Sequence, residues 1–177
     1  MPYREVIQGW HDFYIVAGTG AATLLGLLFV GLSLHLRVVL SRDEVRSLAR
    51  VTLANLGLVL IISMFMVIPQ GVASLRNELL FSGIVTLGAI VPSFVAAIRS
   101  QTRTLQGRLV LRIGLSGVAY LGVVLSSAFY SANSYRSALS ALVAIIVALV
   151  VISLRNSWDL LITVGEVAPA QNMDEND

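Results

Sequence analysis

The chain is 177 residues long; 56% of its residues are hydrophobic and only 12% are charged. Soluble domains carry about 25% charged residues, so this chain has too few charges to cover a soluble fold. Its mean hydropathy of +0.84 indicates a membrane protein. The net charge of +2 and the scattered arginines argue against nucleic-acid binding, and the absence of cysteine excludes disulfides and thiolate sites.

Five stretches of the chain contain no Asp, Glu, Lys or Arg: 13–36, 51–75, 79–98, 113–135 and 137–154. A bilayer core about 30 Å thick needs about 20 helical residues, and backbone groups in lipid must be satisfied within the helix. The sequence therefore predicts an all-α polytopic transmembrane helix bundle. We place its five spans at about 13–36, 48–70, 79–98, 110–131 and 137–158. The last span has the shortest uncharged stretch, 18 residues, at the lower limit for crossing the bilayer core.

The arginines are distributed unequally between the connections that alternate along the chain. One side of a five-span bundle receives nine of the twelve arginines, and the other receives Arg4, Arg76 and Arg136. Short cytoplasmic loops attract the Lys/Arg excess, so we expect the N-terminus outside and the C-terminus in the cytoplasm. The nine include Arg155 and eight residues of the two arginine-rich connections: Arg37, Arg42, Arg46, Arg50, Arg99, Arg103, Arg108 and Arg112.

The two ends of the chain differ from the apolar body. The first apolar run is too long for a signal peptide, and the positive charge follows it, so we expect a retained span. Residues 166–177 are polar and acidic without apolar periodicity, which predicts a disordered tail. The transmembrane helical domain is therefore expected to comprise residues 1–165.

Aromatic and polar residues mix where the first span begins, at Trp10, His11, Asp12 and Tyr14. Trp and Tyr concentrate at the membrane–water interface, so Trp10, His11 and Tyr14 are interpreted as an interfacial anchor. A metal or proton site is the alternative. It is disfavoured because adjacent helical residues point about 100° apart, so His11 and Asp12 are not expected to face one another.

Small residues recur every four positions in the first span, at Gly18, Ala22 and Gly26. Such stripes let two helix backbones approach closely, and packing drives helix association in lipid. We interpret the stripe as a helix-packing seam, with a pore-lining strip as the alternative.

Weakly polar residues recur in four of the spans and could form a polar path through the bundle. Hydrogen bonding between neighbouring helices is the plainer interpretation, worth about 0.6 kcal/mol for each bond. The residues concerned are Thr19, Thr23, Ser33, Asn55, Ser82, Thr86, Ser93, Ser116, Tyr120 and Ser127.

No Asp, Glu, Lys or Arg lies in the middle of any predicted span, although ion-coupled pumps and proton relays usually place ionisable residues there. No P-loop, HExxH, GxSxG or kinase signature is present either. We therefore expect no enzyme activity, no cofactor, no metal, and no catalytic residue.

The segments WHDF (10–13) and GLLFVGLSLHLR (26–37) resemble the start of an uncharacterised family of small bacterial multi-pass membrane proteins. This resemblance covers roughly the first forty residues. It implies a bacterial inner-membrane protein and adds no catalytic or binding residue.

These observations predict a non-enzymatic integral membrane protein that acts through helix–helix contacts, as an accessory or assembly partner of a membrane complex. Its expected partners are the lipid bilayer and either further copies of itself, as a homo-oligomer, or other membrane proteins. The alternative is a homo-oligomeric channel or facilitator for ions or small solutes, which needs several copies in a closed ring. A sensor of lipid headgroups that uses the cytoplasmic arginines is a weaker third hypothesis.

Overall fold

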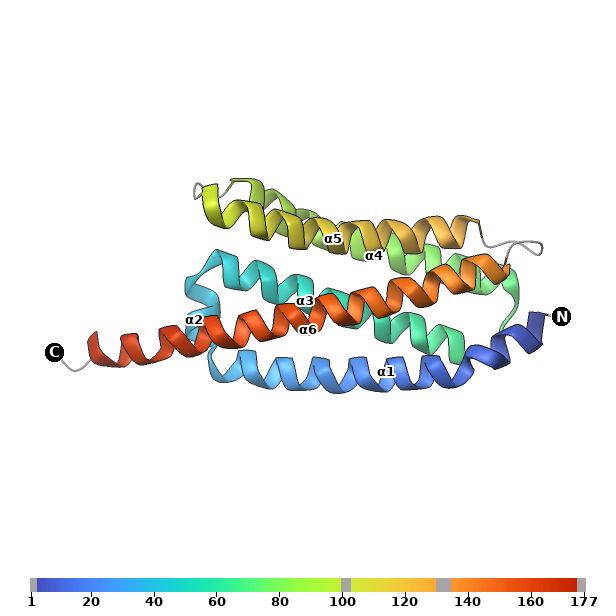
Figure 1. Ribbon diagram of the computed structural model, residues 1–177, viewed down its shortest axis with the longest axis horizontal. Helices are drawn as coiled ribbons and strands as arrows, with labels where there is room; N and C mark the ends of the chain where they lie inside the picture. Colours follow the sequence, from blue (N-terminus) through green and yellow to red (C-terminus); the bar gives the residue numbers. More distant parts are fainter. Residues whose placement is uncertain (1–2, 100–102, 130–134, 175–177) are drawn as a thin grey trace.

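The computed structural model of the chain is an all-α bundle (Figure 1) that describes residues 3–99, 103–129 and 135–174. Its side chains are described for residues 8–37, 39–43, 45–95, 111, 113–129 and 136–163. Six helices occupy these ranges: α1 (Tyr3–Leu34), α2 (Leu36–Ser41), α3 (Asp43–Val67), α4 (Val72–Arg99), α5 (Arg103–Ala128) and α6 (Tyr135–Asp174).

Four of the helices are long and apolar enough to cross a membrane. Their apolar segments are Gln8–Leu34, Val45–Val67, Val72–Val95 and Arg136–Thr163, of 23 to 28 residues. At 1.5 Å per residue, even the shortest exceeds the bilayer core of about 30 Å. In α5, the apolar segment Ile113–Ala128 is shorter. The chain is therefore a multi-pass helical membrane protein.

The long helices run antiparallel in chain order, so their ends gather at two poles of the bundle (Figure 1). Helix α2, the end of α4, the start of α5 and the C-terminal end of α6 lie at one pole. The start of α1, the turn between α3 and α4, and the end of α5 lie at the other. We call the first the arginine-rich pole, because the helix ends there carry the arginine-rich segments 37–50 and 99–112.

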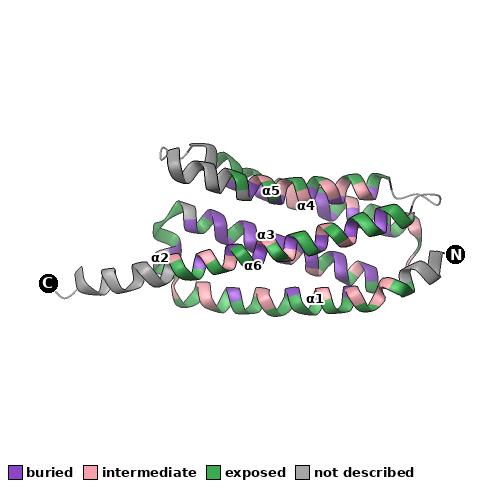
Figure 2. Cartoon of the chain, in the orientation of Figure 1, coloured by how far each residue is buried: buried purple, intermediate pink, exposed green. Residues whose placement is uncertain are grey.

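Helix α3 is the centre of the bundle and contacts every other described helix. Half of its apolar segment is buried (50%), against 17% for that of α1. Figure 2 shows the same contrast, with buried residues frequent along α3 and exposed residues along most of α1. Helix α1 packs mainly against α3 and leaves its opposite side uncovered.

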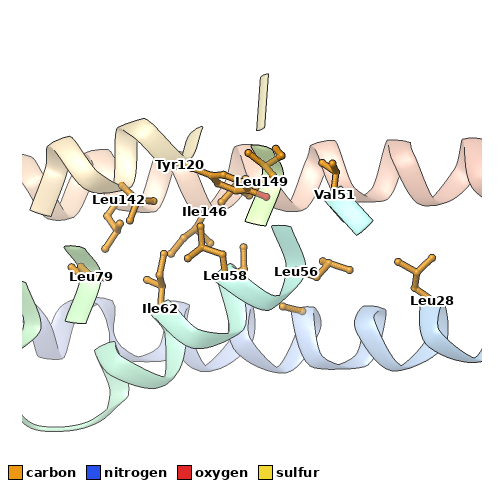
Figure 3. Packing of buried hydrophobic residues seen from close by; sticks show 14 of the residues in the cluster. Leu28, Val51, Leu56, Leu58, Ile62, Leu79, Tyr120, Leu142, Ile146 and Leu149 are labelled. Carbon is orange, nitrogen blue, oxygen red and sulfur yellow. The ribbon is translucent and has the colours of Figure 1, made fainter. Parts of the chain in front are cut away.

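Aliphatic side chains from all six described helices contribute to the core around α3, part of which is drawn in Figure 3. Leu58 and Ile62 of α3 meet Leu142 and Ile146 of α6, while Leu79 of α4 and Leu28 of α1 close the cluster on either side. Lipid is as apolar as these side chains, so close packing and not exclusion from water stabilises the contacts.

The helices extend further than the sequence predicts. Helix α3 begins at Asp43, five residues before the predicted span 48–70, and α6 continues to Asp174. Residues 166–174 are therefore helical, contrary to the predicted disordered tail. Extending an existing helix adds one backbone hydrogen bond per residue without a new nucleation step, so polar residues can continue an apolar helix.

The first break in the bundle comes at His35, between α1 and α2. His35 leaves helical geometry, with φ −120° and ψ 34°, and Arg42 is extended, with φ −122° and ψ 114°. The predicted span 13–36 therefore runs two residues past the end of α1 at Leu34, into the start of α2. The predicted span 48–70 is too long at its C-terminus, because α3 stops at Val67, two residues before Pro69.

Two glycines of α4 provide a direct test of this packing. A Cβ atom at Gly83 would lie 2.8 Å from Cγ2 of Val124 on α5, whereas one at Gly88 would have no neighbour within 4 Å. We expect Gly83→Ala to lower the free energy of unfolding by about 1–3 kcal/mol, as overpacking does. The matched control Gly88→Ala should leave it unchanged. Unfolding in mixed detergent micelles measures both, and equal stability of the two variants would contradict the α4–α5 contact.

Candidate functional site

Three of the predicted polar residues meet in the core, between α3 and α5. The hydroxyl of Tyr120 donates a hydrogen bond to Oδ1 of Asn55, and Nδ2 of Asn55 donates to Oγ of Ser116 at 3.1 Å. All three side chains have no exposed surface. Ser116 and Tyr120 lie four residues apart and therefore share one face of α5. We call these residues the Asn55 cluster.

The Asn55 cluster is neutral and links two helices. Helix α5 packs mainly on α4 and α6, so these bonds provide much of its connection to α3. Asn55 uses both ends of its amide, which fixes its orientation relative to Tyr120 and Ser116. The arrangement is suited to holding two helices in register, and the three side chains contain no group that ionises near neutral pH.

Most of the other predicted polar residues are hydrogen-bonded to their own helices. Thr23 donates to the carbonyl of Thr19 at 2.9 Å, and Thr86 donates to that of Ser82 at 2.7 Å. Similar bonds, at 2.7–3.0 Å, are made by Ser33, Ser82 and Ser127. Ser93 is fully buried and its hydroxyl has no hydrogen-bond partner among the described residues.

The predicted polar residues do not lie on one continuous path. Six face the interior, Thr86 is half-buried, and three are exposed on α1. The interior residues are Asn55, Ser82, Ser93, Ser116, Tyr120 and Ser127; the exposed ones are Thr19, Thr23 and Ser33.

The small residues of the stripe on α1 also differ in their exposure. Gly18 is buried against α3, and a Cβ atom at this position would lie 2.9 Å from Cβ of Ser63. Ala22 and Gly26 are exposed, and a Cβ at Gly26 would have no neighbour within 4 Å. Gly18 thus mediates packing inside the chain, while the other two lie on its outer surface.

The residues predicted to form an interfacial anchor have different environments. Trp10 packs edge-on against Phe13, with ring centroids 6.2 Å apart, and is half-buried. Tyr14 lies in the core with 1% exposure, so its ring does not face the lipid headgroups as an anchor would. Trp10 and Tyr14 lie four residues apart and share one face of α1, but Tyr14 lies one turn further into the bundle, beside Leu60 and Ser63 of α3.

His11 and Asp12 come closer than the sequence predicts. Nδ1 of His11 lies 3.5 Å from Oδ1 of Asp12. The Asp12 side chain is fully exposed. Among the described residues, no group of three His, Asp or Glu side chains is placed to hold a metal ion.

Of the eight arginines in the two arginine-rich connections, four have described side chains, and all four are exposed. Arg46 pairs with Asp43 on the first turn of α3. The side chains of Arg99, Arg103, Arg108 and Arg112 lie outside the described residues. Those that are described are Arg37, Arg42, Arg46 and Arg50.

Sequence reasoning missed a second set of interior polar residues on α6. Ser153 and Asn156 are buried, and Oγ of Ser153 and Nδ2 of Asn156 have no hydrogen-bond partner among the described residues. Their three-residue spacing, which places both on one helical face, was the available signal.

No known family, curated protein or solved structure matches this chain. The resemblance of its first forty residues to small bacterial membrane proteins therefore stays a prediction.

Two buried tyrosines test whether the Asn55 cluster stabilises the bundle. Tyr120→Phe removes a hydroxyl that bonds Asn55, and we expect a loss of about 0.6 kcal/mol, and at most about 1.7 kcal/mol, in the free energy of unfolding. Tyr14→Phe removes a buried hydroxyl that has no partner among the described residues. It should be neutral or slightly stabilising, since no bond is lost. Detergent unfolding compares the two, and an equal effect would show that the Tyr120 bond contributes nothing.

Proposed function

We propose that this protein is a non-enzymatic, five-span protein of the bacterial inner membrane that acts through helix–helix contacts, as an accessory or assembly partner of a membrane complex. The observation that carries the proposal is the uncovered side of α1. Only 17% of its apolar segment is buried, and small residues lie on the exposed part.

The uncovered side of α1 has the composition of a helix-docking surface. We define the outer face of α1 as Thr19, Ala22, Thr23, Gly26 and Ser33, all exposed. At 100° per residue they lie within about 100° of one another around the helix. Small residues let a second backbone approach closely, and hydroxyls can hydrogen-bond across the contact. This face therefore lets a partner backbone approach closely between Thr19 and Gly26, with the exposed side chains of Ile15 and Val30 at its two ends.

The interior of the chain supports a structural role over a catalytic one. The polar side chains buried in the described residues are Ser, Thr and Asn, together with the tyrosine hydroxyls. None of these is charged near neutral pH, and the Asn55 cluster joins two helices. Neutral interior hydrogen bonds that join helices are expected of a protein whose interior serves packing.

A homo-oligomeric channel or facilitator is the alternative, and one observation favours it. Thr19, Thr23 and Ser33 project from the same side of α1, away from the chain's own core. A closed ring of several copies could turn this side towards a shared central path. The interior of a single copy offers no comparable polar stripe in the described part, because the Asn55 cluster is sealed among aliphatic side chains.

The orientation proposed for the chain follows from the arginine-rich pole. That pole carries the two arginine-rich segments and the C-terminal end of α6, so the positive-inside tendency places it in the cytoplasm. Helix α5 must then cross together with the four longer helices, with its 26 residues spanning about 39 Å.

Substitution of Gly26 tests the outer face directly. Gly26→Leu places a large side chain where no atom lies within 4 Å of a Cβ, so the isolated chain should fold normally. We expect association in native-like lipid particles to fall on the order of tenfold, because a leucine separates the backbones. Gly20→Leu is the matched control: Gly20 is also exposed and unopposed, but lies about 120° around α1.

The oligomeric state of both variants is read by mass measurement of the intact particles. Equal association of Gly26→Leu and the parent chain would contradict the proposal. A closed ring of four or more copies, with ion flux in reconstituted vesicles, would replace it with the channel alternative.

The cysteine-free chain allows the orientation to be measured with single introduced thiols. Gly71→Cys lies in the turn between α3 and α4, and Arg42→Cys lies in the arginine-rich pole; both positions are exposed. An impermeant thiol reagent applied to intact cells should label position 71, and should label position 42 only after permeabilisation. The parent chain, without cysteine, is the control. The reverse pattern, or labelling of both from outside, would contradict five spans with this orientation.

A further inference from the structure

A short helix, α2, connects two membrane-spanning helices at the arginine-rich pole. The apolar segment of α1 ends at Leu34 and that of α3 begins at Val45, so α2 (Leu36–Ser41) lies outside both segments. It runs across the long axis of the bundle, from the end of α1 to the start of α3 (Figure 1). Because the long helices cross the bilayer, α2 lies along the membrane surface and not within the hydrocarbon core.

Hydrogen bonds at His35 direct the chain from α1 into α2. The backbone of His35 leaves helical geometry, and its Nδ1 donates a hydrogen bond to the carbonyl of Gly31 at 3.3 Å. The imidazole thereby caps the last turn of α1. The carbonyl of His35 accepts a hydrogen bond from the amide of Val39 at 3.1 Å, which closes the first turn of α2. The direction of α2 is therefore fixed by contacts within the fold.

The side chains of α2 are divided between the bundle, hydrocarbon and charge. Val39 is buried against the bundle (7% exposed), whereas Leu36 and Leu40 are 53% and 57% exposed. These two leucines lie four residues apart and share one side of the helix, about 60–100° from Val39. Arg37 is exposed and lies about 160° from Val39. An apolar side of α2 is therefore next to a cationic one, as in helices that lie in a membrane interface.

The charge of the pole favours an anionic lipid over a neutral one. Nine arginines belong to this pole, and fewer acidic residues lie near them in the chain. Between Thr163, where the apolar segment of α6 ends, and Asp174, the helix rises about 17 Å. This distance exceeds the Debye length of about 8 Å at physiological ionic strength, so Asp174 does not neutralise the pole. The acidic residues nearer to the arginines are Asp43, Glu44, Asp159 and Glu166.

We propose that the exposed side of α2 binds one anionic phospholipid, with an acyl chain along Leu36 and Leu40 and the phosphate beside Arg37 and Arg42. Arg42 directly follows α2 and is exposed. The acyl chain covers two leucines that the described chain leaves uncovered, and guanidinium groups form strong charge-assisted hydrogen bonds with phosphate. The positive charge of the pole then favours a headgroup with a net negative charge. The site does not depend on the outer face of α1 or on which side of the membrane the pole faces.

Competition between two phospholipids that differ in headgroup charge tests the site. The full chain is reconstituted with equal amounts of phosphatidylglycerol and phosphatidylethanolamine that carry the same acyl chains, then released into increasing detergent and weighed intact. We expect the last phospholipid retained to be phosphatidylglycerol. Arg37→Gln and Arg42→Gln should each lower the preference for phosphatidylglycerol about fivefold, the effect of one arginine near an anionic surface.

Arg76→Gln is the matched control, because Arg76 is also exposed but lies at the opposite pole. It should keep the preference of the parent chain. Circular dichroism verifies folding, and if one of the two α2-site variants fails to fold, the other decides. The proposal would be overturned if the parent retained both lipids equally or if Arg37→Gln and Arg42→Gln kept its preference. An equal loss in Arg76→Gln would also overturn it, since only the total charge would then matter.

Spin labels on single introduced cysteines test the placement of α2, because the chain has no cysteine of its own. In lipid vesicles, labels at Leu36→Cys and Leu40→Cys should collide more with oxygen, which concentrates in hydrocarbon, than with a water-soluble nickel complex. A label at Gly71→Cys, exposed in the turn at the opposite pole, should show the reverse. Nickel-accessible labels at both leucine positions would overturn the proposal. No variant here lies on α1, so the result is separable from that of Gly26→Leu.

Discussion

The packing of α3 against every other described helix is the interaction on which the rest of the structure depends. In lipid, each helix satisfies its own backbone hydrogen bonds, so secondary structure forms without tertiary help. The tertiary structure then depends on which helix faces pack against one another. Helix α3 resolves this by being buried on several sides, with aliphatic residues towards α6 and α4, Ser63 against Gly18 of α1, and Asn55 towards α5.

The polar side chains of this bundle fall into two groups, those that form hydrogen bonds within the fold and those that face outward on α1. Neutral hydrogen bonds join α3 to α5 in the interior, and hydroxyl groups elsewhere bond to backbone carbonyls of their own helices. Hydroxyls and small residues on α1 instead face outward, where no other part of the described chain covers them. This division separates residues that stabilise the fold, such as Tyr120, from residues free to contact another molecule, such as Gly26, and it is the basis for proposing a helix-contact function.

The sequence predicts the all-α membrane bundle well, because long uncharged runs leave the chain few alternatives to helices in lipid. It also identifies Asn55, Ser116 and Tyr120 as polar residues within spans, but not that they meet, since pairing depends on which helices become neighbours. Tyr14 and Trp10 are both aromatic residues near the start of the first span, and the sequence does not distinguish them. Tyr14 is buried because of where α3 lies. An open hollow beside the contact between α1 and α3 was similarly unpredictable, because it requires short residues on α1 to lie opposite Leu60 and Met64.

The most direct test of a helix-contact function is photo-crosslinking from α1 in native membranes. A photoreactive amino acid is placed singly at Thr19, Ala22 or Gly26 on the outer face, or at Gly20 or Leu27, which are also exposed but lie about 80–100° from Thr19 around the helix. The account predicts crosslinks to protein from the outer-face positions and crosslinks to lipid from the other two. Crosslinks to lipid alone from all five positions would contradict it, because the outer face of α1 would then have no protein partner.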